Sequence, residues 1–305
     1  AATPVSAYLH AAAMVKAGVY LVAVLAPAFS SVPGWRLAVG LLGAVTMLIG
    51  GWRSLRQTDI KLLLAYGTVS QLGFMVLLTG MGTRSAALAG LAMTIAHALF
   101  KSALFLIIGI IDKSAGTRDL RELSGVGRRM RSLSLVMVLA AASMAGLPPM
   151  LGFVGKEAAF AALVALVSQG DGTGLSPAVA VLVLIAVVLG SVLTMAYSLR
   201  LVWGALALKP GKAETTLTMS PRAMLIAPAL LTLGSLAGGL LASRLGHVLE
   251  PYAESMPLGS ATTHLALWHG LGAPLAASLV AVAGGTLLFL SRERVARIQS
   301  TFPEV

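Results

Sequence analysis

Three lysines lie well inside long apolar stretches of this 305-residue sequence. They are Lys16, Lys101 and Lys156, and the remaining lysines and arginines, of 22 in all, fall outside those stretches. A cationic side chain at the centre of a bilayer costs roughly 2.5–3.5 kcal/mol on insertion scales, so it normally faces a bundle interior or a water-filled cavity. Three such amines in one chain predict a pathway for ions or protons.

The stretch around Lys101 carries two more polar residues on the same helical face. Thr94, His97 and Lys101 are spaced i, i+3 and i+7, which aligns them along one stripe of a helix. A histidine and a buried lysine can both exchange protons near neutral pH. The alternative is a structural histidine bonded to a neighbouring helix, with Lys101 extended to the membrane interface. Because Lys101 is central in its stretch, we favour a proton relay.

The first stretch holds Ser6, His10 and Lys16. Ser6 and His10 are four residues apart and share a helical face, whereas Lys16 is rotated from His10 by about 120°. Lys16 is near the centre of its stretch, so we assign Lys16, His10 and Ser6 to the same path. Polar packing between helices is the alternative for each of them.

Lys156 follows a sequence that breaks helices. Gly146-Leu147-Pro148-Pro149 interrupts an apolar run over residues 132–167, and adjacent prolines remove amide donors and clash with the preceding turn. The run would also span about 54 Å as one helix, against a hydrocarbon core of about 30 Å. We predict two half-helices joined by an unwound stretch, as found at transporter binding sites. Irregular backbone there would give Lys156 access to water.

Glu157 is the only acidic residue inside an apolar run, and it is adjacent to Lys156. Adjacent helix residues point about 100° apart, so a direct ion pair is not required. We place Lys156 and Glu157 on the proton path. A structural pair near the membrane interface is the alternative.

These residues belong to a polytopic membrane protein. Hydrophobic residues make up 57% of the chain and charged residues 11%, compared with about 25% charged residues in soluble domains. The mean hydropathy is +0.90. We therefore predict an all-α membrane helix bundle with about eight transmembrane segments. Apolar runs place them near residues 5–27, 36–52, 61–80, 86–111, 132–167, 177–206, 222–243 and 264–290.

The net charge of +11 is carried by short loops between apolar runs, so it does not indicate nucleic-acid binding. The chain has no cysteine, which excludes disulfides, thiolate metal sites and thiol catalysis. No phosphate-binding glycine loop, zinc-ligand spacing or nucleophile–base pattern is present. We expect no cofactor, no metal site and no enzymatic activity.

Loop charge predicts the orientation of the chain. With eight spans, sixteen of the 22 lysines and arginines lie on one side and three, Arg36, Arg84 and Arg244, on the other. By the positive-inside rule, both ends of this chain are cytoplasmic. A wrong number of spans would have scrambled this alternation.

Taken together, several segments resemble the antiporter-like proteins shared by Mrp-type cation/proton antiporters and respiratory complex I. The segments are residues 3–10, 14–21, 59–73, 97–106 and 147–157. Three further segments resemble the large A-type component of Mrp antiporters specifically: residues 109–119, 197–200 and 267–270. The resemblance covers most of the chain. It implies a partial chain that lacks the N-terminal half of such a component, including a membrane Glu–Lys pair.

The resemblance also assigns roles to residues and regions. It implies that residues 36–206 form the second inverted repeat of the family, a five-helix unit that contains the broken helix. A linking helix over 5–27 would precede this repeat, and two further helices within 207–305 would follow it. Lys101 then matches the central lysine, His97 its adjacent histidine, and Lys156 the terminal lysine of the path. Ser6 and His10 match the helix that links two half-channels.

We therefore expect one component of a hetero-oligomeric Na⁺/H⁺ antiporter in a bacterial plasma membrane, working with other subunits and conducting protons through a Lys/His/water relay. Two alternatives remain open from the sequence. One is a proton-pumping component of a complex I-like dehydrogenase or membrane-bound hydrogenase. The other is a non-conducting scaffold.

Overall fold

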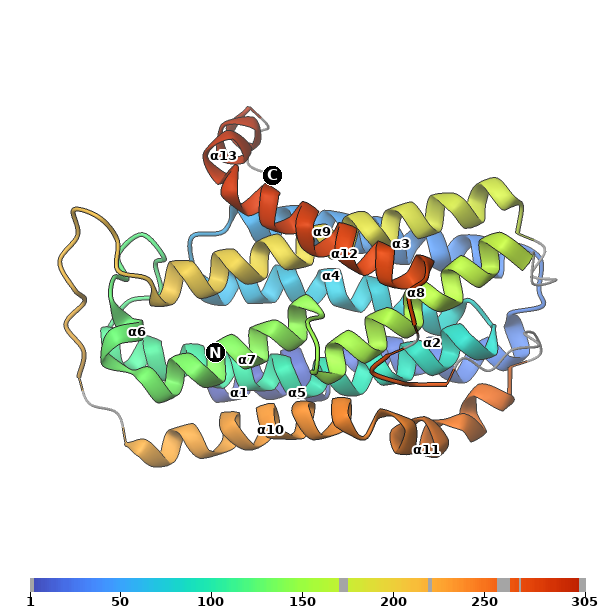
Figure 1. Ribbon diagram of the computed structural model, residues 1–305, viewed down its shortest axis with the longest axis horizontal. Coiled ribbons are helices and arrows are strands. Elements are labelled where there is room, and N and C mark those ends of the chain that lie inside the picture. Colours follow the sequence, from blue (N-terminus) through green and yellow to red (C-terminus); the bar gives the residue numbers. More distant parts are fainter. Residues whose placement is uncertain (1–2, 170–174, 219–220, 257–263, 269, 302–305) are drawn as a thin grey trace.

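The computed structural model describes residues 3–169, 175–218, 221–256, 264–268 and 270–301, and helices dominate them. Among these described residues, eight helical stretches are long and apolar enough to cross a membrane, which confirms the all-α, eight-span prediction. Within the described residues there is no strand, and one isolated bridge joins Asp59 to Asp119. The long helices run side by side along one axis (Figure 1).

The helical elements of the described residues follow one another in this order along the chain. They are α1 (Thr3–Ala7), the π-helical turn η1 (Tyr8–Ala12), α2 (Lys16–Phe29), α3 (Trp35–Arg56), α4 (Ile60–Gly80), α5 (Arg84–Ala115), α6 (Val126–Arg129), α7 (Arg131–Ala145), α8 (Leu151–Gln169), α9 (Pro177–Leu206), the 3₁₀ turn η2 (Arg222–Leu225), α10 (Ile226–Leu240), α11 (Ala242–Glu254), α12 (Ala273–Leu290) and α13 (Arg292–Ser300).

The last span begins later than the sequence predicted. We expected it from residue 264, but α12 starts at Ala273, after an extended Gly272 and with Pro274 in its first turn. Proline is favoured at this position because its amide would have no helical partner there. Residues 264–268 are outside helices, and His269 lies outside the described residues. The segment after 206 also contains the short helices α11 and α13 beside the two spans.

The predicted break in the fifth span is confirmed. α7 ends at Ala145, Gly146 adopts a left-handed φ of 82°, and α8 begins at Leu151. The Pro148–Pro149 peptide bond is cis. Helices α10 and α12 pack against the broken helix, along opposite edges in the view of Figure 1. A side chain at Gly239 of α10 would come within 2.0 Å of the Pro149 carbonyl, so only glycine allows this contact.

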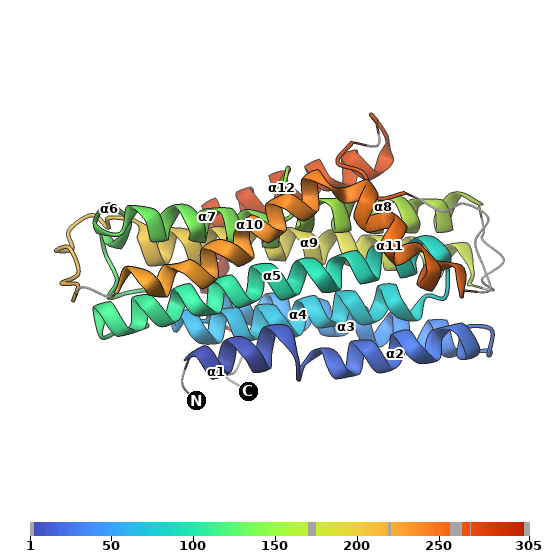
Figure 2. The same ribbon diagram turned by 90° about the horizontal axis from the view of Figure 1, so that it is seen from below.

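The first span, predicted over 5–27, is found over Val5–Phe29, and a break that was not predicted interrupts it. The π-helical turn ends at Ala12, residues 13–15 form a turn, and α2 begins at Lys16. Figure 2 shows α1 and α2 end to end along one edge of the bundle. α1 packs against α5, and α2 packs against α4.

Small residues let α3 and α4 approach closely. A Cβ atom at Gly43 would lie 2.6 Å from the Gly73 carbonyl, and one at Gly50 would lie 2.5 Å from the Ser70 amide nitrogen. The Ser70 hydroxyl donates across this interface to the Met47 carbonyl at 2.7 Å. In lipid, such contacts replace the hydrophobic driving force between helices. They fix α4, which contributes the backbone acceptor for Lys101.

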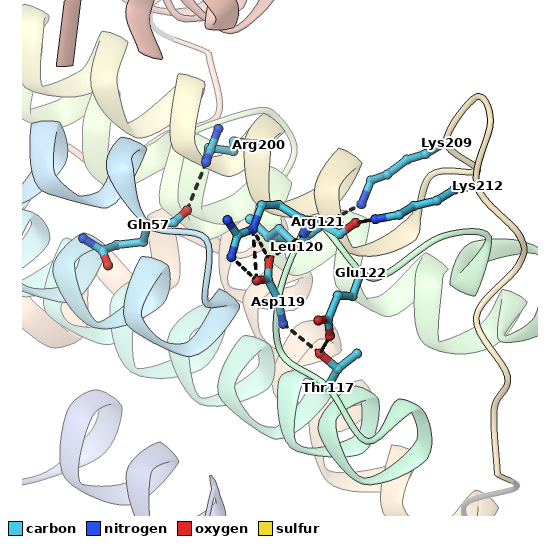
Figure 3. Close-up of polar contacts among 9 residues, drawn as sticks. All are labelled: Gln57, Thr117, Asp119, Leu120, Arg121, Glu122, Arg200, Lys209 and Lys212. Atoms are coloured by element: carbon cyan, nitrogen blue, oxygen red, sulfur yellow. Dashed lines mark hydrogen bonds and ion pairs between the residues drawn. The ribbon is translucent and has the colours of Figure 1, made fainter. Parts of the chain in front are cut away.

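The loops at one end of the bundle are tied together by backbone hydrogen bonds. Ile60 donates to Arg118 at 3.0 Å, and Gly125 donates to Ala207 at 2.9 Å. In Figure 3, Lys209 and Lys212 extend to carbonyl groups of the segment around Leu120 and Arg121. We call this end the basic end, because its joined loops carry Arg118, Arg121, Arg128, Arg129, Lys209 and Lys212.

Candidate functional site

Lys101 is fully buried near the middle of α5, which has 32 residues. Its Nζ donates to the Leu64 carbonyl of α4 at 3.1 Å and lies 5.9 Å from the centroid of the Tyr197 ring of α9. A Cβ atom at Gly67 would sit 3.1 Å from the amine and 3.2 Å from that ring. The Lys101 amine therefore occupies a space bounded by Gly67, the face of the Tyr197 ring and the Leu64 carbonyl.

A polar network continues from Tyr197. The Gln71 amide donates to the Thr194 hydroxyl at 3.1 Å and to the Tyr197 hydroxyl at 3.3 Å. It connects α4 with α9 beside the amine of Lys101. We did not single out Tyr197 from the sequence as a site residue, although a phenol within a very apolar stretch was an available signal.

His97 lies one turn before Lys101 on α5 and is also fully buried. Its ring meets Phe100 edge to face, with 5.4 Å between centroids. Neither ring nitrogen has a hydrogen-bond partner among the described residues, and leaving a buried polar group unbonded costs about 1–3 kcal/mol. The structure thus places His97 and Lys101 one turn apart on α5, both fully buried.

His10 lies in the π-helical turn and stacks on Phe105 of α5, with 5.9 Å between ring centroids. Turns of this kind occur frequently at functional sites. A cavity of about 300 Å³ reaches His10, and its other polar walls are Asp59, Lys61 and Arg118. The cavity connects His10 with charged groups of the basic end. Ser6, one turn earlier on α1, is buried.

Lys16 follows the break of the first span. Its Nζ donates to the Ala11 carbonyl at 2.6 Å, so the amine binds a backbone group on the other side of the interruption. No residue among Ala11-Ala12-Ala13-Met14-Val15 is a helix breaker, and the sequence therefore did not signal this break.

Lys156 makes the same kind of contact at the other break. It is 3% exposed, and its Nζ donates at 2.8 Å to the carbonyl of Ala145, the last residue of α7. Glu157 points elsewhere: it is 2% exposed and accepts a 2.5 Å hydrogen bond from the Ser278 hydroxyl of α12. None of the ion pairs among the described residues joins Lys156 to Glu157. Ser278 was missed from the sequence, because nothing in its local pattern indicates a distant carboxyl group.

The predicted residues thus form two groups. Ser6 and His10 lie on α1 and η1, which pack against α5, the helix that carries His97 and Lys101. Lys16 begins α2, and Lys156 and Glu157 lie in the second turn of α8, after the break. Each of the three lysines donates to a backbone carbonyl. Within the part of the chain that the structure describes, no group of three or more His, Asp or Glu residues could hold a metal ion.

Comparison with known proteins identifies the family. Residues 1–170 match the transmembrane family of NADH:quinone oxidoreductase and Mrp antiporter proteins. The chain belongs to this family. It is 37% identical over 303 residues to the A/B subunit of a probable K⁺/H⁺ antiporter of Rhizobium meliloti, covering 97% of this chain and 29% of that protein. It is 35% identical over 320 residues to the A subunit of the Na⁺/H⁺ antiporter of Alkalihalophilus pseudofirmus, covering 97% and 40%.

Solved structures of the family agree with this assignment. A chain of the Mrp complex from Dietzia sp. DQ12-45-1b matches with a TM-score of 0.86 and 38% identity, over 99% of this chain and 32% of that one. A chain of an archaeal membrane-bound sulfane sulfur reductase has a TM-score of 0.69 over 84% of this chain and 50% of that one, and its 24% identity shows the fold alone. The chain is a multi-pass homologue of the Mrp A subunit. It spans well under half the length of these curated relatives.

Proposed function

We propose that this chain is part of a cation/proton antiporter and moves protons through a hydrated relay of buried amines and imidazoles. The observation that carries the proposal is the way the intramembrane lysines are bound. Lys16, Lys101 and Lys156 each donate to a backbone carbonyl. Both a neutral amine and a charged ammonium can make this bond, so each lysine can lose and regain a proton without losing its partner.

The relay begins at the cavity beside His10. Charged side chains line this cavity, which makes it suitable for water that delivers a proton from the basic end. His97 comes next, because its two unpartnered nitrogens require a donor and an acceptor that water supplies. Lys101 lies one turn from His97 on α5, and Lys16 begins α2. A proton on one of these groups opposes protonation of the others.

The break at Lys156 and Glu157 is the far end of the path. Unwound backbone at membrane depth is tolerated beside water or inside protein, and Gly146 leaves room for the Lys156 stem: a Cβ there would be 2.5 Å from Lys156 Cδ. Glu157, the next residue on α8, and Ser278 of α12 provide a second exchangeable group. Residues 36–206 act as the repeat unit that contains this half-path.

The setting follows from loop charge and from the relatives. Both ends of the chain lie in the cytoplasm, because the positive-inside rule places the basic end there. The membrane is a bacterial plasma membrane, and the partners are the other subunits of a hetero-oligomeric antiporter. The exchanged cation is Na⁺. The relatives include proteins named for Na⁺ and for K⁺, so ion competition tests this choice.

Replacement of Lys156 tests the proposal. The full-length protein is purified in its native assembly and reconstituted in vesicles, where Na⁺-dependent proton flux is measured. Lys156→Ala abolishes flux, whereas Lys212→Ala, at a loop lysine that bonds the Arg121 carbonyl, leaves it unchanged. Size-exclusion chromatography shows whether both variants assemble.

Two results would contradict this function. Unchanged flux in an assembled Lys156→Ala variant would indicate a scaffold. Co-purification of iron–sulfur or flavin subunits with the wild-type protein would indicate a redox-driven pump.

A further inference from the structure

A cavity of about 660 Å³ lies at the basic end, apart from the relay. Four arginines from two separate parts of the chain line it, and its described walls include no acidic residue. The arginines are Arg128, Arg129, Arg131 and Arg222. The first three precede or begin α7, and Arg222 begins the turn before α10.

The charge in this cavity is only partly balanced by the protein. Glu214 pairs with Arg129 at 3.2 Å and with Arg128 at 4.0 Å. Among the described residues, no carboxylate pairs with Arg131 or Arg222. The cavity therefore has positive charge available for an anionic ligand.

The rest of the wall is apolar. Ile110 comes from α5, Leu133 from α7 and Leu225 from the turn that leads into α10. α5, α7 and α10 run from this end along the bundle (Figure 1). The arginines are exposed, whereas Ile110 and Leu133 are nearly buried and Leu225 is partly exposed, so the charged side of the cavity faces out and its apolar side faces the helices. A ligand that fits both parts has an anionic head and hydrocarbon chains.

We propose that this cavity binds an anionic phospholipid. Its phosphate lies among the arginines, and its acyl chains lie along Ile110, Leu133 and Leu225. Basic pockets between transmembrane helices at the cytoplasmic face suit such headgroups. A free phosphate ion would leave the apolar wall unused, and a zwitterionic lipid would leave the arginines uncompensated.

The test uses the purified native assembly that contains the full-length protein. Phosphatidylglycerol and phosphatidylcholine are titrated separately, and bound lipid is counted by native mass spectrometry. The variant is Arg131→Gln with Arg222→Gln, and its control is Arg294→Gln with Arg297→Gln, which removes two arginines of α13 outside the cavity. The first variant weakens phosphatidylglycerol binding about 25-fold, since each arginine near an anionic headgroup contributes about fivefold. The control leaves it unchanged.

Three results would overturn the proposal. They are equal retention of both lipids by the wild type, an equal loss in the α13 control, and displacement of the lipid by millimolar inorganic phosphate. If the double variant fails to assemble, Leu225→Ser decides. It weakens phosphatidylglycerol binding by removing apolar contact, and unchanged binding contradicts the assignment of the chains.

Discussion

The cations inside the membrane and those of the basic end are held by different partners. The intramembrane lysines bind backbone carbonyls, at Ala11, Leu64 and Ala145. Four loop arginines bind carboxylates instead, in the pairs Arg118–Asp59, Arg121–Asp119, Arg128–Glu214 and Arg129–Glu214. The two regions therefore constrain charge in different ways.

A carboxylate stabilises the charged form of its partner, whereas a carbonyl accepts a hydrogen bond from an amine in either protonation state. Arginine also keeps its proton under all ordinary conditions, and lysine does not. The paired loop arginines thus carry fixed charges, and the intramembrane lysines are amines whose charge can change. Lys209 is the informative intermediate: it donates to the carbonyls of Gly204, Leu120 and Leu123 at the basic end, and partial burial lowers its pKa.

The strongest test of this contrast replaces lysine by arginine in both regions. Lys101→Arg retains a positive charge and hydrogen-bond donors but cannot release a proton. We expect proton flux in reconstituted vesicles to fall about 100-fold, the scale of losing a proton-transfer group. Lys209→Arg is the matched control, because Lys209 also binds carbonyls but lies outside the spans. Proton flux through the Lys209→Arg variant should stay at the wild-type level. Normal flux through an assembled Lys101→Arg protein would remove Lys101 from the relay.

The next test gives Lys101 a partner like those of the loops. Thr68 donates to the Leu64 carbonyl at 2.9 Å, the same carbonyl that accepts from Lys101. Thr68→Asp therefore places a carboxylate near the amine and holds it in the charged form, and we expect flux to fall about tenfold. Thr68→Asn has a similar shape without the charge, so it should retain most of the flux. Equal flux in the two variants would show that the charge state of Lys101 does not limit transport.

The sequence was sufficient for the features that depend on residue type. The buried lysines, the number of spans and the break at Gly146–Pro149 follow from hydropathy and from glycine and proline positions. The break before Lys16 could not be predicted, because alanine, methionine and valine do not end a helix. In the structure the Lys16 amine binds the Ala11 carbonyl across this turn, a contact between residues five positions apart.

The partners of the site residues depend on contacts between distant segments. Ser278 bonds Glu157 across 121 positions, and Gln71 bonds Tyr197 across 126. Local periodicity places each of these side chains on a helix face but does not choose the opposing helix. In contrast, the later start of α12 was accessible from sequence, since Gly272 and Pro274 are helix-start signals that the apolar residues before them obscured.

The third prediction concerns the stability of the folded protein, which depends on the packing around the interior lysines. Gly146 has a φ of 82°, and a methyl group there would lie 2.5 Å from Lys156 Cδ. Gly211, in the basic end, has a φ of 71° with nothing within 4 Å. We expect Gly146→Ala to destabilise the protein by about 3 kcal/mol, from backbone strain and displacement of the lysine, and Gly211→Ala by about 1 kcal/mol, from strain alone. Thermal unfolding in detergent compares them, and equal losses would show that Lys156 does not depend on the space at Gly146.

The smallest effect should come from the loop pairs, because water already stabilises their charges. A hydrogen bond from the Arg121 side chain holds the pKa of Asp119 below its ordinary value, so the pair stabilises the folded protein above the unfolded-state pKa of about 3.9 and loses this contribution as pH falls through the lower folded-state value. Asp119→Asn should lower the melting temperature by about 1–2 °C at pH 7, with the difference from wild type shrinking below about pH 4. Flux should not change. A loss of flux at constant stability would mean that the loop charges take part in transport, and the division between fixed and changeable cations would then fail.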